Sequence, residues 1–563
     1  MKLNYKRTVC VGFAFFLICA FWQAYDNTIP MILTNKFGMR QTVSGIIMAL
    51  DNILALFMLP LFGAISDRTK SRMGRRTPYI LFGTAVAVAA FVGLSVVDGM
   101  QLKNLGDISK IDDPMVLEQI YDETESMELL TPDGESFIPS HLFTKEEFTD
   151  IRSMTVYGEN AVTNPNYTKY VVPARNAVVR RISTENRGTL ILFIALLLIA
   201  LISMATFRSP AVALMPDVTI KPLRSKANAV INLMGSAGGI LVLVLGMVFA
   251  TSAVRNSMMS YRAYFGVIAG VMLLALLIFM LTVREPRFVR EMRAESIRWN
   301  LEGGENAAAT DDANKAGAAE NASAAKTASA AGTDENASAA KTASKATAAK
   351  SGSATKKAGL GAAQRRSLIF ILASIVLWFT GYNAVTSKYS VYASTILHKD
   401  YNLTLIIAQA AAIVSYLPVG IVASKIGRKK TILAGVVMLA AAFGTAAFMR
   451  ADSPTALMNA MFALAGIAWA TINVNSFPMV VEMCSAEEVG KYTGFYYTAS
   501  MAAQVMTPIF SGFLMDKLGM TVLFPYAVIF VAAAFATMLF VRHGDSKPEA
   551  KKCLEALEDM DAD

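Results

Sequence analysis

Twelve long apolar segments are the feature of this sequence that most restricts its fold. Each contains about 20 residues or more, which is the length that a helix needs to cross a bilayer. Inside lipid every backbone polar group needs a partner within the protein, so continuous apolar segments of this length must be helices. The sequence therefore predicts an all-α membrane protein with twelve transmembrane helices. The segments are residues 9–33, 43–65, 78–98, 188–207, 227–251, 262–283, 367–397, 403–424, 431–449, 455–480, 493–515 and 521–541.

The composition and the charge pattern agree with a multi-pass membrane protein. Hydrophobic residues make up 54% of the chain and charged residues 17%, well away from the average of soluble proteins. An even number of spans puts both termini on one side, and the basic loops fall on that side, which indicates the cytoplasm. We therefore expect a plasma-membrane protein within the lipid bilayer. The net charge of +9 is a topology signal, and we expect no nucleic-acid partner.

Two long insertions interrupt the spans. Residues 99–187 fall outside and are rich in acidic residues, aromatics and prolines; a small, partly folded cap and an inert surface insertion both remain open. Residues 299–365 fall inside and consist mainly of small and polar residues, so they predict a low-complexity linker without a core. The expected organisation is residues 1–98 and 188–298 for the N-terminal bundle, 99–187 for the outer insertion, 299–365 for the linker, 366–541 for the C-terminal bundle and 542–563 for a cytoplasmic tail.

A short basic turn between the second and third spans is the most informative motif. It reads Gly-x-x-x-Asp-Arg and then Gly-Arg-Arg, and it is too charged to enter the membrane. Its glycines permit close backbone approach, and its acid can pair with a nearby arginine. We interpret the turn as a cytoplasmic gate, while a plain topology signal is the structural alternative. The predicted gate residues are Gly63, Asp67, Arg68, Arg72, Gly74, Arg75 and Arg76, joined by Asp217 at the end of span four.

This turn resembles the signature loop of the major facilitator superfamily. Its extended form from Ser66 to Pro78 is similar to the sucrose-transporter and glycoside–pentoside–hexuronide:cation symporter branch. The resemblance covers nearly all of the helical part and neither insertion. It implies two pseudo-symmetric six-helix bundles that transport a solute by alternating access. Arg208 stands where melibiose-type permeases carry an acid, and sucrose-type members carry an arginine in this region; this favours proton coupling, with sodium left open.

The two halves of the chain repeat each other's polar positions. The segment Gly420–Lys430 repeats the basic turn after span eight. Trp22-x-x-x-Asp26-Asn27 in span one matches Trp378-x-x-x-Tyr382-Asn383 in span seven. Paired halves with a binding site between them near the middle of the membrane are a transporter architecture.

Charged residues inside the spans are few, and each is a functional candidate because lipid penalises a charge. Asp26 and Asp51 are the predicted carriers of the coupling ion. Aromatic rings next to amides suit a sugar, since ring faces stack and amides bind hydroxyls. The structural alternatives are acids that only fix helix packing and bases that extend to the interface. The predicted substrate-binding residues are Asn27, Asn52, Arg208, Tyr382, Asn383 and Lys388.

We therefore predict a secondary active transporter, a monomeric proton-coupled symporter of a sugar such as a sucrose-like disaccharide or another glycoside. We expect no cofactor besides the coupling ion. An exporter or antiporter of another small solute and a membrane sensor that does not transport remain alternatives. An enzyme is disfavoured, because the sequence contains no nucleophile–His pairing and no phosphate loop. Its four cysteines have neither a disulfide framework nor metal-site spacing.

Overall fold

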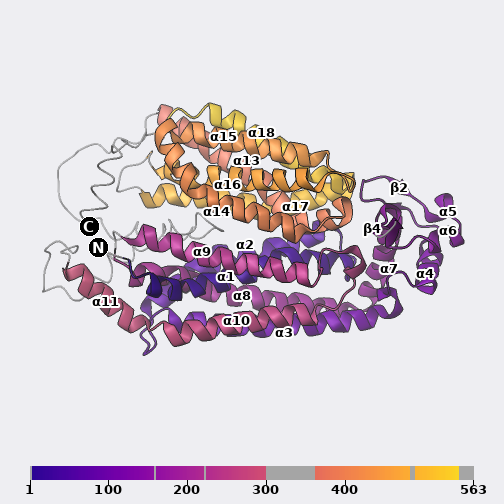
Figure 1. The fold of residues 1–563 in the computed structure, drawn as a ribbon, viewed down its shortest axis with the longest axis horizontal. Helices are drawn as coiled ribbons and strands as arrows, with labels where there is room; N and C mark the ends of the chain where they lie inside the picture. Colours follow the sequence, from indigo (N-terminus) through magenta and orange to yellow (C-terminus); the bar gives the residue numbers. More distant parts are fainter. Residues whose placement is uncertain are drawn as a thin grey trace.

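The computed structural model describes residues 3–543, with gaps at 158–159, 221–222, 299–361, 482 and 484–488. Within these residues, twelve long helices run side by side along the long axis of the molecule (Figure 1). The predicted all-α, twelve-helix architecture is confirmed. Ten of the twelve are long and apolar enough to cross a membrane by length and composition, and α14 (Tyr401–Ile426) adds a shorter apolar segment, Tyr401–Tyr416. The predicted linker, except for its last four residues, and almost all of the predicted tail lie outside the described residues.

The helices form two bundles, each with its own hydrophobic core. We call them the N-half and the C-half. The helices of the N-half are α1 (Tyr5–Asn35), α2 (Gln41–Arg68), α3 (Thr77–Leu105), α8 (Arg187–Val218), α9 (Arg224–Val248), α10 (Arg262–Thr282) and the short α11 (Glu285–Arg298). The helices of the C-half are α13 (Ala362–Tyr392), α14, α15 (Arg428–Ala447), α16 (Thr455–Val481), α17 (Val489–Leu518) and α18 (Leu523–Leu539), with η6 (Ala393–Leu397) after α13 and η8 (Met520–Val522) after α17.

Local sequence signals set several helix ends. The Asn4 side chain accepts a hydrogen bond from the backbone of Arg7 and so caps α1, and Asp400 caps α14 in the same way through Asn402. Pro78 occupies the first turn of α3, where its missing N–H costs nothing. These caps allow the apolar segments to begin as helices close to the predicted positions.

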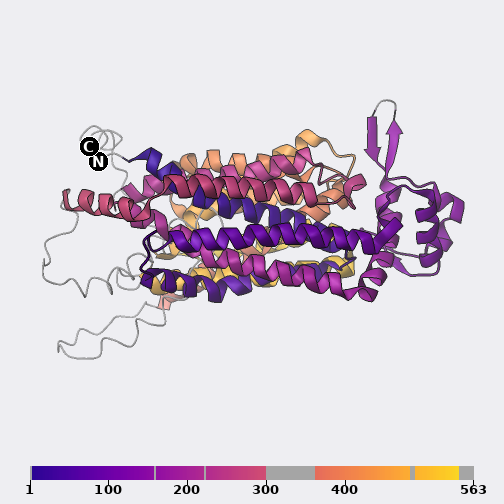
Figure 2. The same ribbon diagram turned by 90° about the horizontal axis from the view of Figure 1, so that it is seen from below.

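The insertion between α3 and α8 is folded. It has a hydrophobic core of its own, centred on residues such as Ile120, Phe148 and Val178, and it projects beyond the helices at one end of the molecule (Figure 2). We call this the insertion end; α11 lies at the opposite end, the α11 end (Figure 1). The elements of the insertion are η1 (Gly106–Ser109), α4 (Pro114–Thr124), β1 (Leu129–Leu130), β2 (Ser136–Phe137), α5 (Pro139–Leu142), α6 (Lys145–Thr149), β3 (Met154–Tyr157), β4 (Asn160–Thr163), η2 (Tyr167–Val171) and α7 (Val172–Glu185). The strands pair as two antiparallel hairpins.

The insertion also contacts the C-half. At the tip of the β1–β2 hairpin, the backbone carbonyl of Pro132 accepts a hydrogen bond of 2.6 Å from the amide of Met520. Gly519 next to it has φ +87°, and a Cβ there would lie 2.3 Å from the carbonyl carbon of Asp133. Only glycine fits this backbone-to-backbone contact. The Thr168 hydroxyl is 3.2 Å from His398 Nε2, which makes a second link between the insertion and the C-half.

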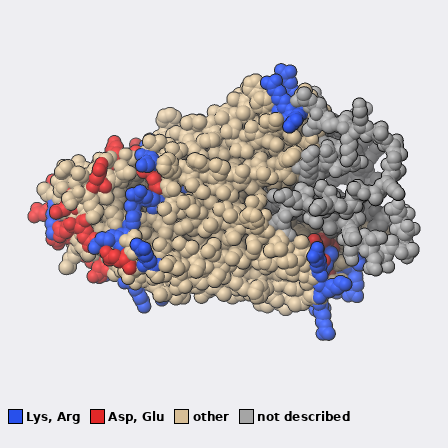
Figure 3. Space-filling view, turned by 180° about the vertical axis from the view of Figure 1, so that it is seen from behind, with Lys and Arg blue, Asp and Glu red and all other residues tan. Residues whose placement is uncertain are grey.

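The face of the molecule drawn in Figure 3 divides into three zones. Lys, Arg, Asp and Glu gather toward the two ends, and a broad belt of other residues lies between them (Figure 3). Large apolar side chains such as Phe57, Phe82 and Val414 are mostly exposed. Apolar surface on this scale faces lipid in a membrane protein, whereas a soluble monomer rarely exposes it.

Candidate functional site

Polar residues of α1 and α8 meet inside the N-half. Trp22 and Asp26 are four residues apart and therefore share one face of α1. Arg208 of α8 is 6% exposed. Its guanidinium carbon lies 5.3 Å from the centre of the Trp22 ring, and the guanidinium is within electrostatic reach of Asp26. A cation over an aromatic face and beside a carboxylate is a stable arrangement for a buried arginine.

Asp51 of α2 lies near the same place. Tyr25 is within electrostatic reach of both Asp26 and Asp51. The Asn52 amide donates a hydrogen bond of 2.9 Å to Asp51 Oδ1, so this amide orients the carboxylate. Three helices thus bring together Asp26, Asp51 and Arg208. Asn27 is turned toward its own helix, since its Nδ2 donates to the Gln23 carbonyl at 2.8 Å.

A pair of amides joins this cluster to the C-half. The Gln409 side chain of α14 donates a 2.5 Å hydrogen bond to Gln23 Oε1 of α1. Gln23 is one residue from Trp22 and three from Asp26 along α1, so the pair lies within one helical turn of the arginine cluster. Gln23 lies inside the Trp22–Asp26 motif, and this position is the sequence signal that could have identified it.

On the C-half, Tyr382 stacks on Trp469 of α16, with ring centres 3.6 Å apart and planes at 5°. Trp469 is a residue that the sequence patterns did not identify. The Asn383 amide nitrogen is buried and has no hydrogen-bond partner in the described part of the chain. A stacked aromatic face and a free amide donor are the groups that bind a ring carrying hydroxyls.

Lys388 lies elsewhere, at the insertion end. Its side chain is fully buried, and its Nζ donates to the backbone carbonyl of Gln41 at 2.7 Å. Asp516 of α17 accepts hydrogen bonds from the amides of Gln41 and Thr42, both at 2.8 Å, and from the Thr42 hydroxyl at 2.5 Å. Gln41 is ten residues from Asp51 along α2, or roughly 15 Å of helix. Lys388 and Asp516 therefore join the two halves at the start of α2, away from Arg208.

The basic turn of the sequence motif folds into an ion-pair cluster at the α11 end. Arg76 Nε donates to Asp217 Oδ2 at 2.9 Å, and Arg75 lies 3.4 Å from the same oxygen. Arg76 also pairs with Asp67 and donates to Ser66 Oγ at 2.5 Å. Four of the predicted gate residues thus meet. Arg68 and Arg72 are exposed, and Gly63 lies against Ser209 of α8.

Glu285, at the start of α11, completes this cluster. Its carboxylate is 1% exposed and accepts hydrogen bonds from the backbone amides of Arg75 (2.6 Å), Arg76 (3.0 Å) and Thr77 (2.8 Å). These amides form the N-terminus of α3, which favours a negative charge. Gly74 makes room for it, because a Cβ at Gly74 would lie 2.3 Å from the carboxyl group. The sequence offered only a weak signal, one acid followed by proline in a basic stretch.

Comparison with known proteins supports this picture. The family model described as Major Facilitator Superfamily matches residues 182–415 and 395–556, and the model described as MFS/sugar transport protein matches residues 10–101. No curated protein matches the chain.

Solved structures of similar fold include the inward-open xylose transporter XylE from E. coli, with 15% identity over 99% of this chain and 100% of that one, at a TM-score of 0.53. The structure of a D-xylose-proton symporter has 14% identity over 96% of this chain and 99% of that one, at a TM-score of 0.54. A bacterial homologue of the human drug peptide transporters PepT1 and PepT2 has 10% identity over 100% of both chains, at a TM-score of 0.51. The chain therefore belongs to the major facilitator superfamily, and it is a multi-pass membrane transporter of a small-molecule solute and not an enzyme.

Proposed function

We propose that this transporter is a proton-coupled sugar symporter of the sucrose-transporter type, working as a monomer in the plasma membrane. The observation that carries the proposal is the cluster of Asp26, Arg208 and Trp22, which lies beside the inter-half pair Gln23–Gln409. A carboxylate and an arginine at the contact of two halves combine ion coupling with a place for a solute.

The coupling step would use the carboxylates. Asp26 in its charged form attracts Arg208, and a proton on Asp26 removes that attraction. The freed arginine can then donate its hydrogen bonds to a substrate hydroxyl. Asp51, held by Asn52 at 2.9 Å, is the second carrier. The sugar would bind better when Asp26 is protonated and Arg208 is released than when the two are paired. Proton and sugar would therefore be taken up together.

Sugar as the substrate class is supported by the aromatic and amide groups. Trp22 and the Tyr382–Trp469 stack offer ring faces, and the buried Trp22 Nε1 and Asn383 Nδ2 have no partner among the described residues. Such donors suit the hydroxyl oxygens of a glycoside. The match of residues 10–101 to a sugar-transport family model points the same way.

The two ends would act as alternating gates. Lys388 and Asp516 join the halves at the insertion end, which would face outside. The Arg76–Asp217–Glu285 cluster lies entirely on N-half helices at the α11 end, which we assign to the cytoplasm from its basic loops. In this proposal the contacts at the insertion end close the outer gate. The inner cluster would contact the C-half only after the two halves rotate relative to each other.

The test is uptake into proteoliposomes that contain the purified protein. Mono- and disaccharides are screened with and without a proton gradient and, separately, a sodium gradient. Asp26→Asn should lower proton-driven uptake at least tenfold while sugar counterflow persists, because exchange of sugar needs no net proton movement. The matched control is Asp107→Asn, at an exposed residue of the insertion, which should retain both activities. Normal proton-driven uptake by Asp26→Asn would remove Asp26 from the mechanism.

The same assay separates the alternatives. Uptake that needs a sodium gradient and no proton gradient would identify sodium as the coupling ion. Efflux of a solute in exchange for protons would identify an antiporter or exporter. Sugar binding without flux under any gradient would identify a sensor and would overturn the symporter proposal.

A further inference from the structure

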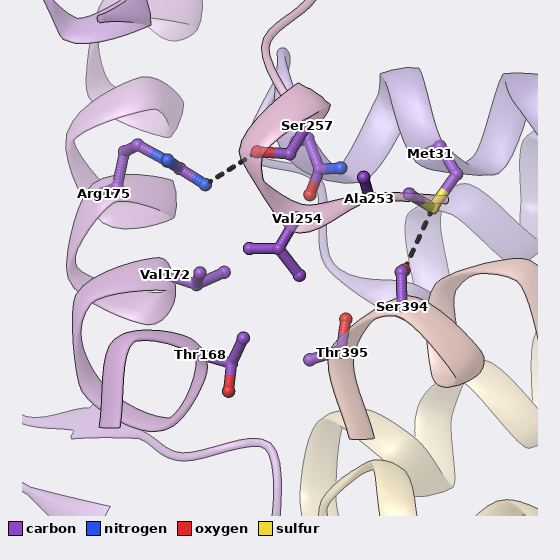
Figure 4. A pocket seen from close by; sticks show the side chains of 10 residues that line it. Met31, Thr168, Val172, Arg175, Ala253, Val254, Ser257, Ser394 and Thr395 are labelled. Carbon is purple, nitrogen blue, oxygen red and sulfur yellow. Dashed lines mark hydrogen bonds between the residues drawn. The ribbon is translucent and has the colours of Figure 1, made fainter. Parts of the chain in front are cut away.

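A pocket at the insertion end is formed where three parts of the chain meet (Figure 4). Its cavity volume is about 20 Å³, and it is partly open to solvent. The insertion contributes Thr168 and Arg175, the segment between α9 and α10 contributes Ser257, and η6 of the C-half contributes Ser394 and Thr395. None of these residues belongs to the proposed transport site.

Arg175 is the only charged residue among those that line this pocket, and its side chain is 1% exposed. Its Nη1 donates to the Tyr167 hydroxyl at 2.8 Å and its Nη2 to the Ser257 hydroxyl at 3.2 Å. Its Nε has no hydrogen-bond partner in the described ranges. Both partners are neutral hydroxyl groups, so the guanidinium is buried without a balancing carboxylate in contact.

Nearby acids are already engaged. Asp112 is within electrostatic reach of Tyr167, but its carboxylate accepts hydrogen bonds from the amide of Ser153 at 2.6 Å and from the Ser153 hydroxyl. Among the residues that the structure describes, no Asp or Glu oxygen lies within 4.0 Å of an Arg175 nitrogen. A buried guanidinium without a counter-ion is strongly unfavourable.

We propose that this pocket binds a small monovalent anion, of which chloride is the best fit, as the counter-ion of Arg175. Two donor groups belong to residues that line the pocket: the Nε–H of Arg175, which has no partner in the described ranges, and the hydroxyl of Ser257. The Ser257 hydroxyl accepts a hydrogen bond from Arg175 and keeps its own hydrogen to donate. The cavity volume of about 20 Å³ is roughly the space of one water molecule, so it is too small for a carboxylate or a phosphate group. A single-atom anion such as chloride fits this space.

The position of the pocket gives such an anion a structural role. Ser394 of η6 contacts Met31 of α1 through a 3.5 Å hydrogen bond between its hydroxyl and the methionine sulfur. Insertion, N-half and C-half therefore all reach this pocket. An anion bound there would stabilise the arrangement in which the insertion packs against both halves.

The test is the thermal unfolding midpoint of the purified full-length protein in detergent. Chloride is titrated against gluconate at constant ionic strength. The midpoint should rise and saturate with chloride. Arg175→Gln should abolish this rise or weaken the apparent affinity at least tenfold. Arg181→Gln is the matched control, because Arg181 lies on the same helix, is exposed and pairs with Glu123 at 2.5 Å.

Two further measurements keep the proposal falsifiable if Arg175→Gln folds poorly. Ser257→Ala removes one donor and should weaken the chloride dependence several-fold. Chloride-35 NMR line broadening by the wild-type protein should decrease with added bromide, a competing halide. A midpoint that is equal in chloride and gluconate, or a chloride response that persists in Arg175→Gln, would overturn the anion site. None of these readouts depends on sugar transport, so a failure here is distinct from a failure of the symporter proposal.

Discussion

At the scale of single residues, the cluster at the α11 end depends on one position without a side chain. Gly74 has φ +111°, a backbone conformation that other residues rarely adopt, and its missing Cβ leaves the space that the Glu285 carboxylate occupies. The carboxylate then caps α3 and lies among the backbone amides next to Arg75 and Arg76. The glycine and the acid therefore act together to fix the turn.

Gly74→Ala should lower the free energy of unfolding by about 1–3 kcal/mol, from strained backbone and from displacement of Glu285. The measurement is the thermal unfolding midpoint in detergent. Gly420→Ala is the matched control, because a Cβ at Gly420 of α14 meets no atom within 4 Å; its midpoint should stay close to that of the wild type. Equal midpoints for the two variants would contradict this account of the turn.

For several contacts, the sequence patterns identified one of the two partners and missed the other. The motif identified Arg76 and Asp217, which the structure places 2.9 Å apart. Glu285 and Asp516 bind backbone amides far away in the sequence. Because almost every residue has a backbone amide, the residue types in the sequence do not indicate such a contact. Lys388 was assigned from its place in a span, but its partner, the Gln41 carbonyl, could be found only by folding the chain.

At the scale of elements, the length of the apolar segments predicted which parts of the chain form helices. It predicted the residues at which the helices end less accurately. α3 continues to Leu105 and α8 to Val218, beyond the predicted residues 98 and 207. The added residues pack in protein cores, since Leu105 belongs to the core of the insertion and Val218 to that of the N-half. The fold of the insertion could not be predicted, since its short helices and strands are stabilised by a small core assembled from scattered residues.

The end of η6 predicts a pH response. His398 has a left-handed φ of +50°. Burial lowers the pKa of its imidazole below 6.5, and the charge of Lys399 lowers this pKa further, while a hydrogen bond to the backbone carbonyl of Ser394 acts in the opposite direction. As the pH falls through about 6.5, the unfolded chain takes up a proton that the folded protein does not. The free energy of unfolding should therefore decrease with acidification, by less than about 1.4 kcal/mol per pH unit.

This response is checked by the unfolding midpoint between pH 8 and pH 5. His398→Gln should reduce the slope in this range, because glutamine does not titrate. His141→Gln is the matched control, since His141 lies in the insertion away from the C-half contact. An unchanged slope in His398→Gln would show that other groups cause the loss of stability in acid.

At the scale of the whole molecule, hydrogen bonds between described residues join the two halves at the insertion end. Asp516 binds the first turn of α2 through three hydrogen bonds and is within electrostatic reach of Lys388. The start of α2 is thus held by two residues of the C-half. This explains how the N-half and C-half, each with its own core, keep one relative position.

Asp516→Ala should favour opening at the insertion end, because it removes these hydrogen bonds and leaves Lys388 buried without its nearby acid. In a cysteine-free background with Ser44→Cys, a position in α2 that is fully buried, a membrane-impermeant maleimide should react at least several-fold faster. Asp452→Asn, at an exposed residue, is the control. Equal labelling rates would show that Asp516 does not hold the halves together.

The contact between the β1–β2 hairpin and the turn that follows α17 has a practical consequence. Pro132 and Met520 are far apart in the sequence but share a backbone hydrogen bond, so the surface around them is a composite epitope. An antibody fragment selected for this epitope would recognise the protein only while hairpin and turn touch. Such a reagent would report the conformation of single molecules and would trap the transporter in the state described here.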